Sequence, residues 1–383
     1  MQSRVYLDWN ATAPLRSEAR EAVVRAMDIC GNPSSVHAEG RKARHLIEDA
    51  RAAVANAIGA QAEGIVFVSG GTEANATALV PGWARGRAGK SCERLIVSAI
   101  EHPSVLAGGS FAPERVARAP VTSDGIVDLD ALQSLIQVQD GAPPLVSLML
   151  ANNETGAIQP VSQAAALVHA AGGILHVDAV QALGRIPLDV RDLGADLVSV
   201  SAHKIGGPKG VGALAIVDPE LRSPAPLLRG GGQERNRRAG TENVAGIAGF
   251  GVAAAIAGVD LEEFSRMQSL RDRLEAGLAE TAGVIIFSRG VPRLPNTTLF
   301  AMADMRAETA VIAFDLEGIA VSSGAACSSG KVQPSHVLTA MGVVPELVRS
   351  AIRISLGHST KEDDIDRALE AWIKLSGVLR KAS

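Results

Sequence analysis

Lys204 stands in the segment Ser201-Ala202-His203-Lys204-Ile205-Gly206-Gly207, directly after an apolar run that predicts a buried strand. Shortly upstream, another apolar run ends in His176-Val177-Asp178. A lysine and an aspartate at the exits of neighbouring strands are what pyridoxal phosphate chemistry requires. The lysine forms a Schiff base with the cofactor, and the aspartate keeps the pyridine nitrogen protonated so that the ring accepts electrons. The alternative is a surface lysine beside a Gly-Pro turn, and this segment alone leaves both interpretations open.

A glycine-rich segment, Ser69 to Asn75, follows another predicted strand and opens a helix. Gly70 and Gly71 let the backbone approach an anion closely, the helix N-terminus offers free N–H groups, and Thr72 adds a hydroxyl. These features suit a phosphate monoester. The alternative is an ordinary strand–helix turn in which Thr72 is the N-cap.

Three further polar residues are candidates for the same site. His102 follows a predicted strand; it could stack on an aromatic cofactor and transfer protons, or be a hydrogen-bonded structural residue. Asn153, in Asn152-Asn153-Glu154-Thr155-Gly156, could bond the cofactor's phenolic oxygen or a substrate, or form a polar turn. Arg353 lies in an alternating stretch that predicts a strand, where a guanidinium could grip a substrate carboxylate or simply occupy a sheet edge.

Cys327 lies in a run of small residues, Ser322-Ser323-Gly324-Ala325-Ala326-Cys327-Ser328-Ser329-Gly330. A buried structural cysteine normally sits in an apolar element, whereas this segment predicts an exposed and mobile loop. A thiolate at this position would be a strong nucleophile. Cys30 and Cys92 are interpreted as structural or incidental.

Apolar runs alternate with helical patterns between about residues 43 and 220. The alternation predicts an α/β fold with a mainly parallel sheet covered by helices, in which ligands collect at the carboxyl ends of the strands. The expected strands are 65–68, 95–97, 145–150, 174–177, 197–200 and 213–217. A second region has its own strand signals, including 284–287, and ends in a helix near 361–380.

The composition is that of a globular protein, with 383 residues, 47% hydrophobic and 20% charged residues and a net charge of −4. This charge gives no broad reason to expect binding to nucleic acid or to an anionic membrane. No segment resembles a membrane span, and the first residues lack the apolar core of a signal peptide, so a cytoplasmic location is expected. The three cysteines form neither a disulfide framework nor a metal-ligand pattern.

Taken together, these motifs resemble the class V, fold-type I pyridoxal phosphate enzymes, and among them the cysteine desulfurases of the NifS/IscS kind. The resemblance runs from Tyr6 to about Leu356 and also includes the segments 31–37, 230–234, 238–243 and 322–329. It implies a large cofactor-binding domain, residues 15–255, with a mainly parallel seven-stranded sheet. It also implies a smaller α+β domain from residues 1–14 and 256–383 that carries the mobile cysteine loop. Asn236 departs from a common glycine, but asparagine tolerates a left-handed backbone.

The resemblance assigns a role to each candidate residue. Lys204, Cys327 and His102 would be catalytic, and Asn153 and Arg353 would bind the substrate carboxylate. The residues expected to bind pyridoxal 5'-phosphate are Gly71, Thr72, His102, Asn153, Asp178, Gln181, Ser201, His203, Lys204 and Thr241. Thr241 would reach the phosphate of the neighbouring subunit, which predicts a homodimer. No metal is expected in catalysis, although Cys327 could act as a transient iron–sulfur ligand.

The activity that the resemblance implies is removal of sulfur from L-cysteine, giving L-alanine and a persulfide on Cys327. The sulfur would pass to an iron–sulfur scaffold or another acceptor protein. Selenocysteine lyase, an aminotransferase of the same class, and a non-catalytic sulfur-relay or scaffold protein remain as alternatives. An aminotransferase would have no use for a mobile Cys327, and intact Lys204, Asp178 and His102 argue against a non-catalytic protein.

Overall fold

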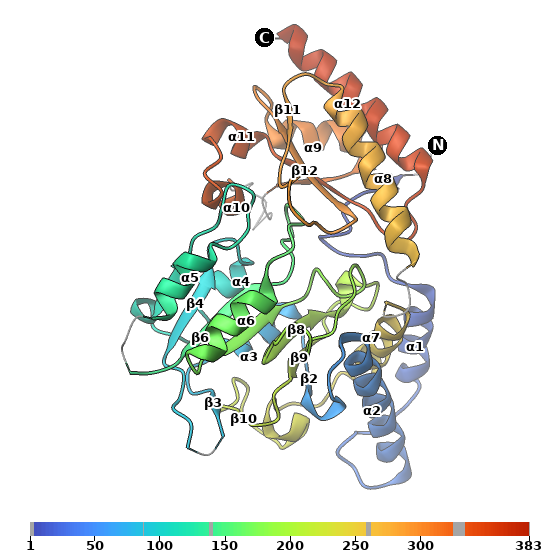
Figure 1. The fold of residues 1–383 in the computed structure, drawn as a ribbon. Coiled ribbons are helices and arrows are strands. Elements are labelled where there is room, and N and C mark those ends of the chain that lie inside the picture. Colours follow the sequence, from blue (N-terminus) through green and yellow to red (C-terminus); the bar gives the residue numbers. More distant parts are fainter. Residues whose placement is uncertain (1–3, 87, 138–140, 258–261, 325–333, 383) are drawn as a thin grey trace.

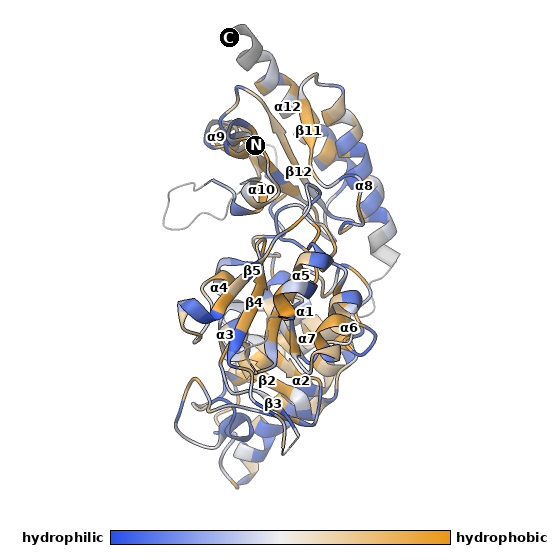
Figure 2. Ribbon diagram, turned by 60° about the vertical axis from the view of Figure 1, so that its left-hand side comes forward, coloured by the Kyte–Doolittle hydropathy of each residue, from blue (hydrophilic) through white to orange (hydrophobic). Residues whose placement is uncertain are grey.

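The computed structural model describes residues 4–86, 88–137, 141–257, 262–324 and 334–382. It places a large α/β region below a smaller region that contains both ends of the chain (Figure 1). The same two regions are seen from another side in Figure 2, where the strands of the large sheet are largely apolar. None of the helices in the described ranges is both long and apolar enough to cross a membrane.

The large region is built on a seven-stranded sheet with the strand order β2-β9-β8-β7-β6-β4-β5. β9 pairs antiparallel with both of its neighbours, and the other neighbouring strands pair parallel. The mainly parallel seven-stranded sheet expected from the sequence is therefore confirmed. The strands are β2 (Ile65–Val68), β4 (Arg94–Ser98), β5 (Val116–Ala119), β6 (Pro144–Met149), β7 (Ile174–Asp178), β8 (Leu197–Ser201) and β9 (Gly212–Ile216).

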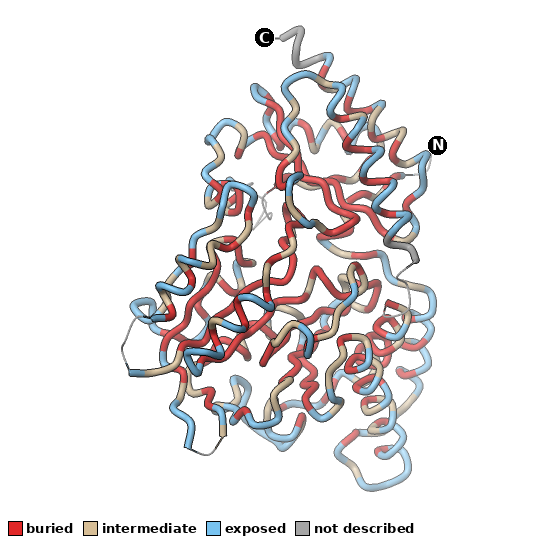
Figure 3. The backbone as a smooth tube through the Cα atoms, in the orientation of Figure 1, coloured by how far each residue is buried: buried red, intermediate tan, exposed pale blue. Residues whose placement is uncertain are grey.

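Successive residues of these strands face opposite layers of helices, because side chains alternate along a strand. In β2, Ile65 and Phe67 belong to one core cluster, and Val66 and Val68 belong to another. The first cluster includes residues of α1 (Ser17–Met27), α2 (Ala38–Ile58), α5 (Leu129–Ile136), α6 (Val161–Ala170) and α7 (Val244–Ala257). The second includes residues of α3 (Gly71–Ala78) and α4 (Pro103–Leu106). Figure 3 shows the resulting buried layer along the sheet.

The smaller region contains a four-stranded sheet with the order β11-β12-β15-β14, in which all pairs are antiparallel. Its strands are β11 (Val284–Ile286), β12 (Thr297–Met302), β14 (Ser322–Ser323) and β15 (Ile352–Ser355). Its helices are α8 (Glu262–Ala279), α9 (Ala307–Leu316), α10 (His336–Ala340), α11 (Pro345–Ser350) and α12 (Glu362–Ala382). Phe300 and Trp372 meet edge to face in its core, with ring centroids 5.1 Å apart. The boundaries 14/15 and 255/256 remain our proposal.

The first residues of the chain join the smaller region before they reach the large one. β1 (Val5–Tyr6) pairs parallel with β13 (Ile319–Ala320), and Asp8 bridges to Ser355. Ala13 N then donates to His203 O, at 2.8 Å. The segment 5–13 therefore runs across the junction between the regions.

Sequence patterns missed some short elements and one edge strand. β5 contains Arg118 and has partly exposed positions, so it lacks the continuous apolar run that identified its neighbours. β3 (Ala84–Arg85) and β10 (Leu221–Arg222) form a two-residue antiparallel pair that no sequence pattern distinguishes. Asn236 does adopt a left-handed backbone, with φ of 64°.

Candidate active site

The carboxyl ends of five strands of the large sheet converge on one cavity of about 170 Å³. β2, β4, β6 and β7 lead to Gly71, His102, Asn153 and Asp178, while Lys204 follows β8 in the short 3₁₀ turn Ala202–Lys204. The cavity is lined by Gly71, Thr72, Asn75, His102, Ser104, Met149, Ala151, Asn153, Asp178, Val180, Gln181, Ser201, His203 and Lys204. Residues spread over more than 130 positions of sequence thus form one site, as expected for an open α/β sheet.

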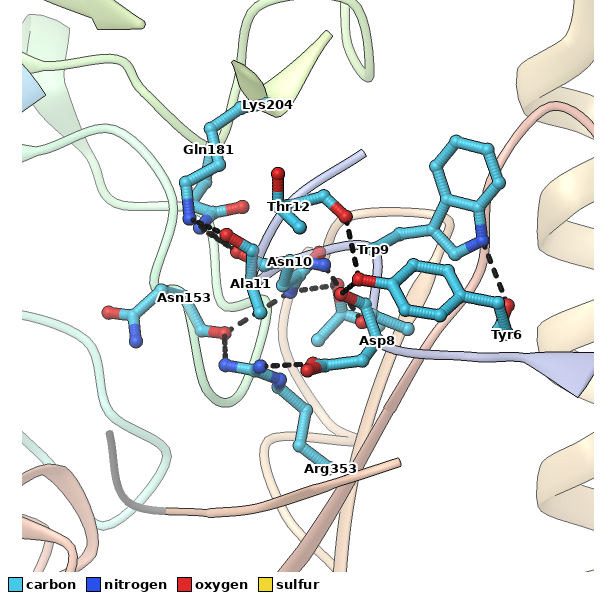
Figure 4. Close-up of polar contacts among 12 residues, drawn as sticks. Tyr6, Asp8, Trp9, Asn10, Ala11, Thr12, Asn153, Gln181, Lys204 and Arg353 are labelled. Carbon is cyan, nitrogen blue, oxygen red and sulfur yellow. Dashed lines mark hydrogen bonds and ion pairs between the residues drawn. The ribbon is translucent and has the colours of Figure 1, made fainter. Parts of the chain in front are cut away.

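The amine of Lys204 lies against the N-terminal segment, as Figure 4 shows. Its Nζ donates to Asn10 O at 2.5 Å and to Ala11 O at 2.9 Å. Burial lowers the pKa of Lys204 to about 7, and the nearby cations Arg185 and Arg353 act in the same direction. Lys204 is therefore able to give up and take back a proton near neutral pH.

Asp178 is held rigidly by two donors. Its Oδ2 accepts from Asn75 Nδ2 at 2.8 Å, and its Oδ1 accepts from Val180 N at 3.0 Å. The side chain is only 6% exposed. A carboxylate in this position presents a fixed negative charge to whatever occupies the cavity.

His102 is fixed through Ser104. Its Nδ1 lies 2.7 Å from Ser104 Oγ and accepts from Ser104 N at 3.2 Å. Burial lowers the pKa of His102, and Lys204 and His336 lower it further, while Asp178 opposes the shift. The ring is therefore neutral at neutral pH and offers a flat, uncharged surface to the cavity.

The other end of the cavity is suited to an anion. The N-terminus of α3 presents Gly71 and Thr72, and Ser201 Oγ is buried without a hydrogen-bond partner. A Cβ added to Gly71 would lie 3.0 Å from Val180 Cγ2, so glycine keeps this approach open. Burial, together with Lys204, lowers the pKa of His203 to about 4, which leaves a neutral imidazole beside these donors.

A second cavity of about 660 Å³ adjoins the first and shares His102, Asn153, Gln181 and Lys204 with it. Arg353 lines this second cavity, and its Nη2 donates to Asp8 Oδ1 at 2.6 Å. Its Nη1 donates to Asn153 O at 3.1 Å. Asn153 Oδ1 is buried without a partner. The guanidinium of Arg353 and the side-chain amide of Asn153 thus both line the second cavity.

Thr241 is the predicted cofactor-binding residue that does not line the cavity, and the position of Cys327 is not described. Thr241 is exposed and does not line either cavity, so its contact with a second subunit stays a prediction. Cys327 lies outside the described residues. All other predicted cofactor-binding residues line the first cavity, and Arg353 lines the second.

Sequence reasoning missed several residues that hold the site together: Asn10, Asn75, Ser104 and Arg185. For Asn75 a signal existed, because it lies three residues after Thr72 and therefore on the same helix face. Asn10 is only 1% exposed and donates to both Asn153 O and Thr297 Oγ1. Its partners are 143 and 287 residues away, so no local pattern could identify it.

The fold and the site define a class of enzyme that carries its cofactor on a lysine, opposite a carboxylate, at the edge of a parallel sheet. The family described as aminotransferase class-V matches residues 5–368, and the chain belongs to this family. A cysteine desulfurase from Cereibacter sphaeroides is 44% identical, with 99% of this chain and 97% of that protein covered. A cysteine desulfurase IscS from Dictyoglomus turgidum is 41% identical, with 100% and 97% covered.

Solved structures agree with this assignment. The structure of a NifS-like protein from Rickettsia africae matches with a TM-score of 0.87 and 37% identity. The match covers 97% of this chain and 99% of that one. The expected fold type is therefore confirmed, and the enzyme depends on pyridoxal phosphate, as its family does.

The residues of the cavity fit this cofactor. Ser201 Oγ, Thr72 and the N-terminus of α3 form an anion site with at least one unsatisfied buried hydroxyl. Asp178 would provide the carboxylate for a pyridine nitrogen, and Lys204 would provide the amine for an aldehyde. The neutral ring of His102 provides an aromatic face. The phosphate, the pyridine nitrogen, the aldehyde and the ring of the cofactor thus each have a matching group in the chain.

Proposed function

We propose that this protein is a cysteine desulfurase that converts L-cysteine to L-alanine and collects the sulfur on Cys327. The relatives named cysteine desulfurase cover nearly the whole chain, and they confirm the function predicted from the sequence. The observation that carries the proposal is the pair Lys204 and Asp178, lining a cavity that opens into a second one containing Arg353.

Arg353 and Asn153 would hold the substrate. Arg353 is only 6% exposed, and its guanidinium forms an ion pair with the Asp8 carboxylate. A guanidinium binds a carboxylate through two parallel N–H groups, and the amide of Asn153 adds a further contact. These interactions would fix the substrate α-carbon near Lys204, which shares the second cavity with Arg353.

Lys204 would remove the proton from the substrate α-carbon. Its lowered pKa keeps a substantial fraction of the amine neutral near pH 7, which a general base requires. The carbonyls of Asn10 and Ala11 hold the amine when it is protonated. The bound cofactor supplies an electron sink for the carbanion, and Asp178 maintains that sink by its negative charge.

Cys327 would accept the sulfur. Its thiolate attacks the substrate sulfur, an S–S bond forms and the Cβ–S bond breaks. The electron pair of the broken bond stays with the substrate carbon, which takes up a proton, equivalent to the one released by the Cys327 thiol, and becomes the methyl group of alanine. Substrate cysteine and one protein thiol thus give alanine and one persulfide, with atoms and electrons balanced. We further propose that the protein works as a homodimer and passes the persulfide sulfur to an iron–sulfur scaffold or another acceptor protein.

Cys327→Ser tests the proposal, because a hydroxyl is far less nucleophilic than a thiolate at neutral pH. The variant should keep the yellow colour of bound cofactor and still bind L-cysteine. Alanine release should fall by about two orders of magnitude or more. No persulfide should appear on the peptide containing residue 327 in mass spectrometry.

Cys30→Ser is the matched control. Cys30 is an exposed free thiol, so its replacement should change neither alanine release nor the persulfide. Cys92 is buried, and burial raises its pKa to about 12, which makes it a poor nucleophile. Unchanged cysteine turnover in Cys327→Ser would remove the desulfurase function. Retained activity on selenocysteine alone would point to a selenocysteine lyase.

A further inference from the structure

Arg185 is a buried cation close to Lys204, and the mechanism proposed above gives it no role. It is 5% exposed and, together with Lys204, lines a small third cavity of about 40 Å³. Burial lowers its pKa to about 9, so it remains charged at neutral pH. Among the described residues, no carboxylate forms an ion pair with it.

The hydrogen bonds of Arg185 go to oxygens of two segments. Nη1 donates to the backbone oxygen of Gln181 at 3.0 Å and also to the amide oxygen Oε1 of the same residue. Nη2 donates to Trp9 O at 3.3 Å. Because a guanidinium can only donate, it must face the oxygen of the Gln181 amide.

The nitrogen of the Gln181 amide then points the other way. Nε2 donates to Asn10 O at 3.1 Å, and the same oxygen accepts from Lys204 Nζ at 2.5 Å. Figure 4 shows Gln181 and Lys204 meeting at this oxygen. A continuous hydrogen-bonded chain therefore leads from Arg185 through Gln181 and Asn10 to the lysine.

A buried charge without a counter-ion is costly, and an apolar side chain of similar volume would normally be more stable in such a place. The charge acts on Lys204, since Arg185 is the first of the cations that lower its pKa. The other charged groups near Lys204 are Arg353, which acts in the same direction, and Asp178 and Asp8, which oppose it. His102 and His203 also line the cavity, and both are neutral at pH 7.

We propose that Arg185 is a positioning residue with two effects on the active site. It fixes the Gln181 amide so that Nε2 donates to Asn10 O at the edge of the cavity, and it places a positive charge close to Lys204. This inference deepens the proposed function, because it concerns the cofactor that the function requires.

The test is a pH titration of the visible absorbance of the holoenzyme without L-cysteine. Replacing Arg185 by methionine removes the charge and leaves a flexible apolar side chain. The protonation midpoint at the Lys204 nitrogen should rise by about one pH unit, since a neighbouring cation disfavours the protonated form. Arg185→Lys restores the charge and should return the midpoint to within about 0.3 units of the wild-type value.

Two further variants separate charge from hydrogen bonding. Arg185→Gln keeps a donor for Gln181 but removes the charge, so it should shift the midpoint as Arg185→Met does. This variant also tests the charge effect if the methionine variant does not fold. In a double-mutant cycle, Gln181→Leu should reduce the effect of Arg185→Met on KM for L-cysteine, because the two residues act through one contact. Additive effects in this cycle would refute the proposal that Arg185 fixes the Gln181 amide.

Arg271→Met is the matched control, because Arg271 is also buried and donates to a backbone oxygen, Leu294 O, but lines none of the three cavities. Its titration should match the wild type. An unshifted midpoint in both Arg185→Met and Arg185→Gln would overturn the proposed charge effect. The titration needs no desulfuration, so normal midpoint shifts in a protein that releases no alanine would contradict the proposed function and not the role of Arg185.

Discussion

Asp178 and Lys204 leave adjacent strands, β7 and β8, and each is held by its own set of groups. Asn75 of α3 and the backbone of Val180, just after β7, fix Asp178, whereas Asn10 and Ala11 hold Lys204 from the N-terminal segment. The carboxylate and the amine are therefore positioned by different contacts. Single substitutions should separate their contributions.

Asp178→Asn is expected to bind the cofactor and lose most of its turnover. The amide keeps the shape of the side chain and can still accept from Val180 N, but it cannot stabilise a protonated pyridine nitrogen. We expect kcat to fall by about 10²-fold or more. Steady-state alanine release and the cofactor content of the purified variant measure the two effects, and a fully loaded variant with a wild-type rate would contradict the role of Asp178.

The residues that could be predicted at this scale were those that end or follow an apolar strand. Lys204, Asp178 and His102 were identified because the strand pattern and the chemistry agree at each position. Asn10 and Arg185 could not be identified, because their roles arise from contacts with segments far away in the sequence. The contact of Asn10 with Gln181 spans 171 residues, and that of Arg185 with Trp9 spans 176.

At the scale of elements, the loops after β4 and β6 bring two buried carboxyl groups close to the site. Glu101 follows β4 and is fully buried; its Oε1 accepts from Ser98 Oγ and from Met149 N, while Oε2 has no partner. Glu154 follows β6 and accepts from Ser335 Oγ, the N-cap of α10, at 2.5 Å. Glu101 thus connects β4 with β6, and Glu154 connects the loop after β6 with the N-terminus of α10.

Glu101→Gln should make the stability of the protein less dependent on pH. Burial raises the pKa of Glu101 to about 8, so the folded protein retains a proton that the unfolded chain releases above its ordinary carboxyl pKa. Stability therefore falls as the pH rises between the two values, by on the order of a few kcal/mol. The glutamine variant lacks this loss, so its Tm should decline less between pH 5 and pH 8 than that of the wild type.

Calorimetry at several pH values measures the effect, with Glu280→Gln as the control, because Glu280 is an exposed residue just after α8. The control should reproduce the wild-type slope. A Glu101→Gln slope equal to that of the wild type would show that Glu101 does not titrate in this range. The strands β4 and β6 could be located from the sequence, but the burial of a particular carboxyl group depends on the packing of several elements.

At the scale of the whole molecule, the loop that carries Thr241 is anchored firmly although Thr241 itself is exposed. Glu234 receives two hydrogen bonds from Arg51 and one from Phe67 N, and all three residues are buried. The three consecutive residues 234–236 have positive φ, a strained backbone that this buried ion pair holds in place. The loop is thus presented at the surface in a defined shape, as a contact with a second subunit requires.

Mixed dimers test whether Thr241 acts on the partner's site. One chain carries Thr241→Ala and the other carries Lys204→Ala, and each homodimer should release little or no alanine. If Thr241 serves the neighbouring subunit, both defects fall in one site and the mixed dimer should recover about half of the wild-type activity per dimer. If Thr241 serves its own subunit, each site has a defect and no activity returns. Tandem affinity tags isolate the mixed dimer for the assay.

The path of the first residues has a consequence for the way the protein folds. Asp8 meets Arg353 across 345 residues of chain, and β1 pairs with β13, so these contacts join the first part of the chain to a part near its end. Contacts of such high sequence separation form late, because the loop that they close must be ordered first. During synthesis the N-terminal residues cannot complete these contacts until β15 has left the ribosome. A nascent chain can therefore assemble its large sheet well before it can bind a substrate. Lys204 takes both of its backbone acceptors, Asn10 O and Ala11 O, from the segment that this closure joins to the smaller region.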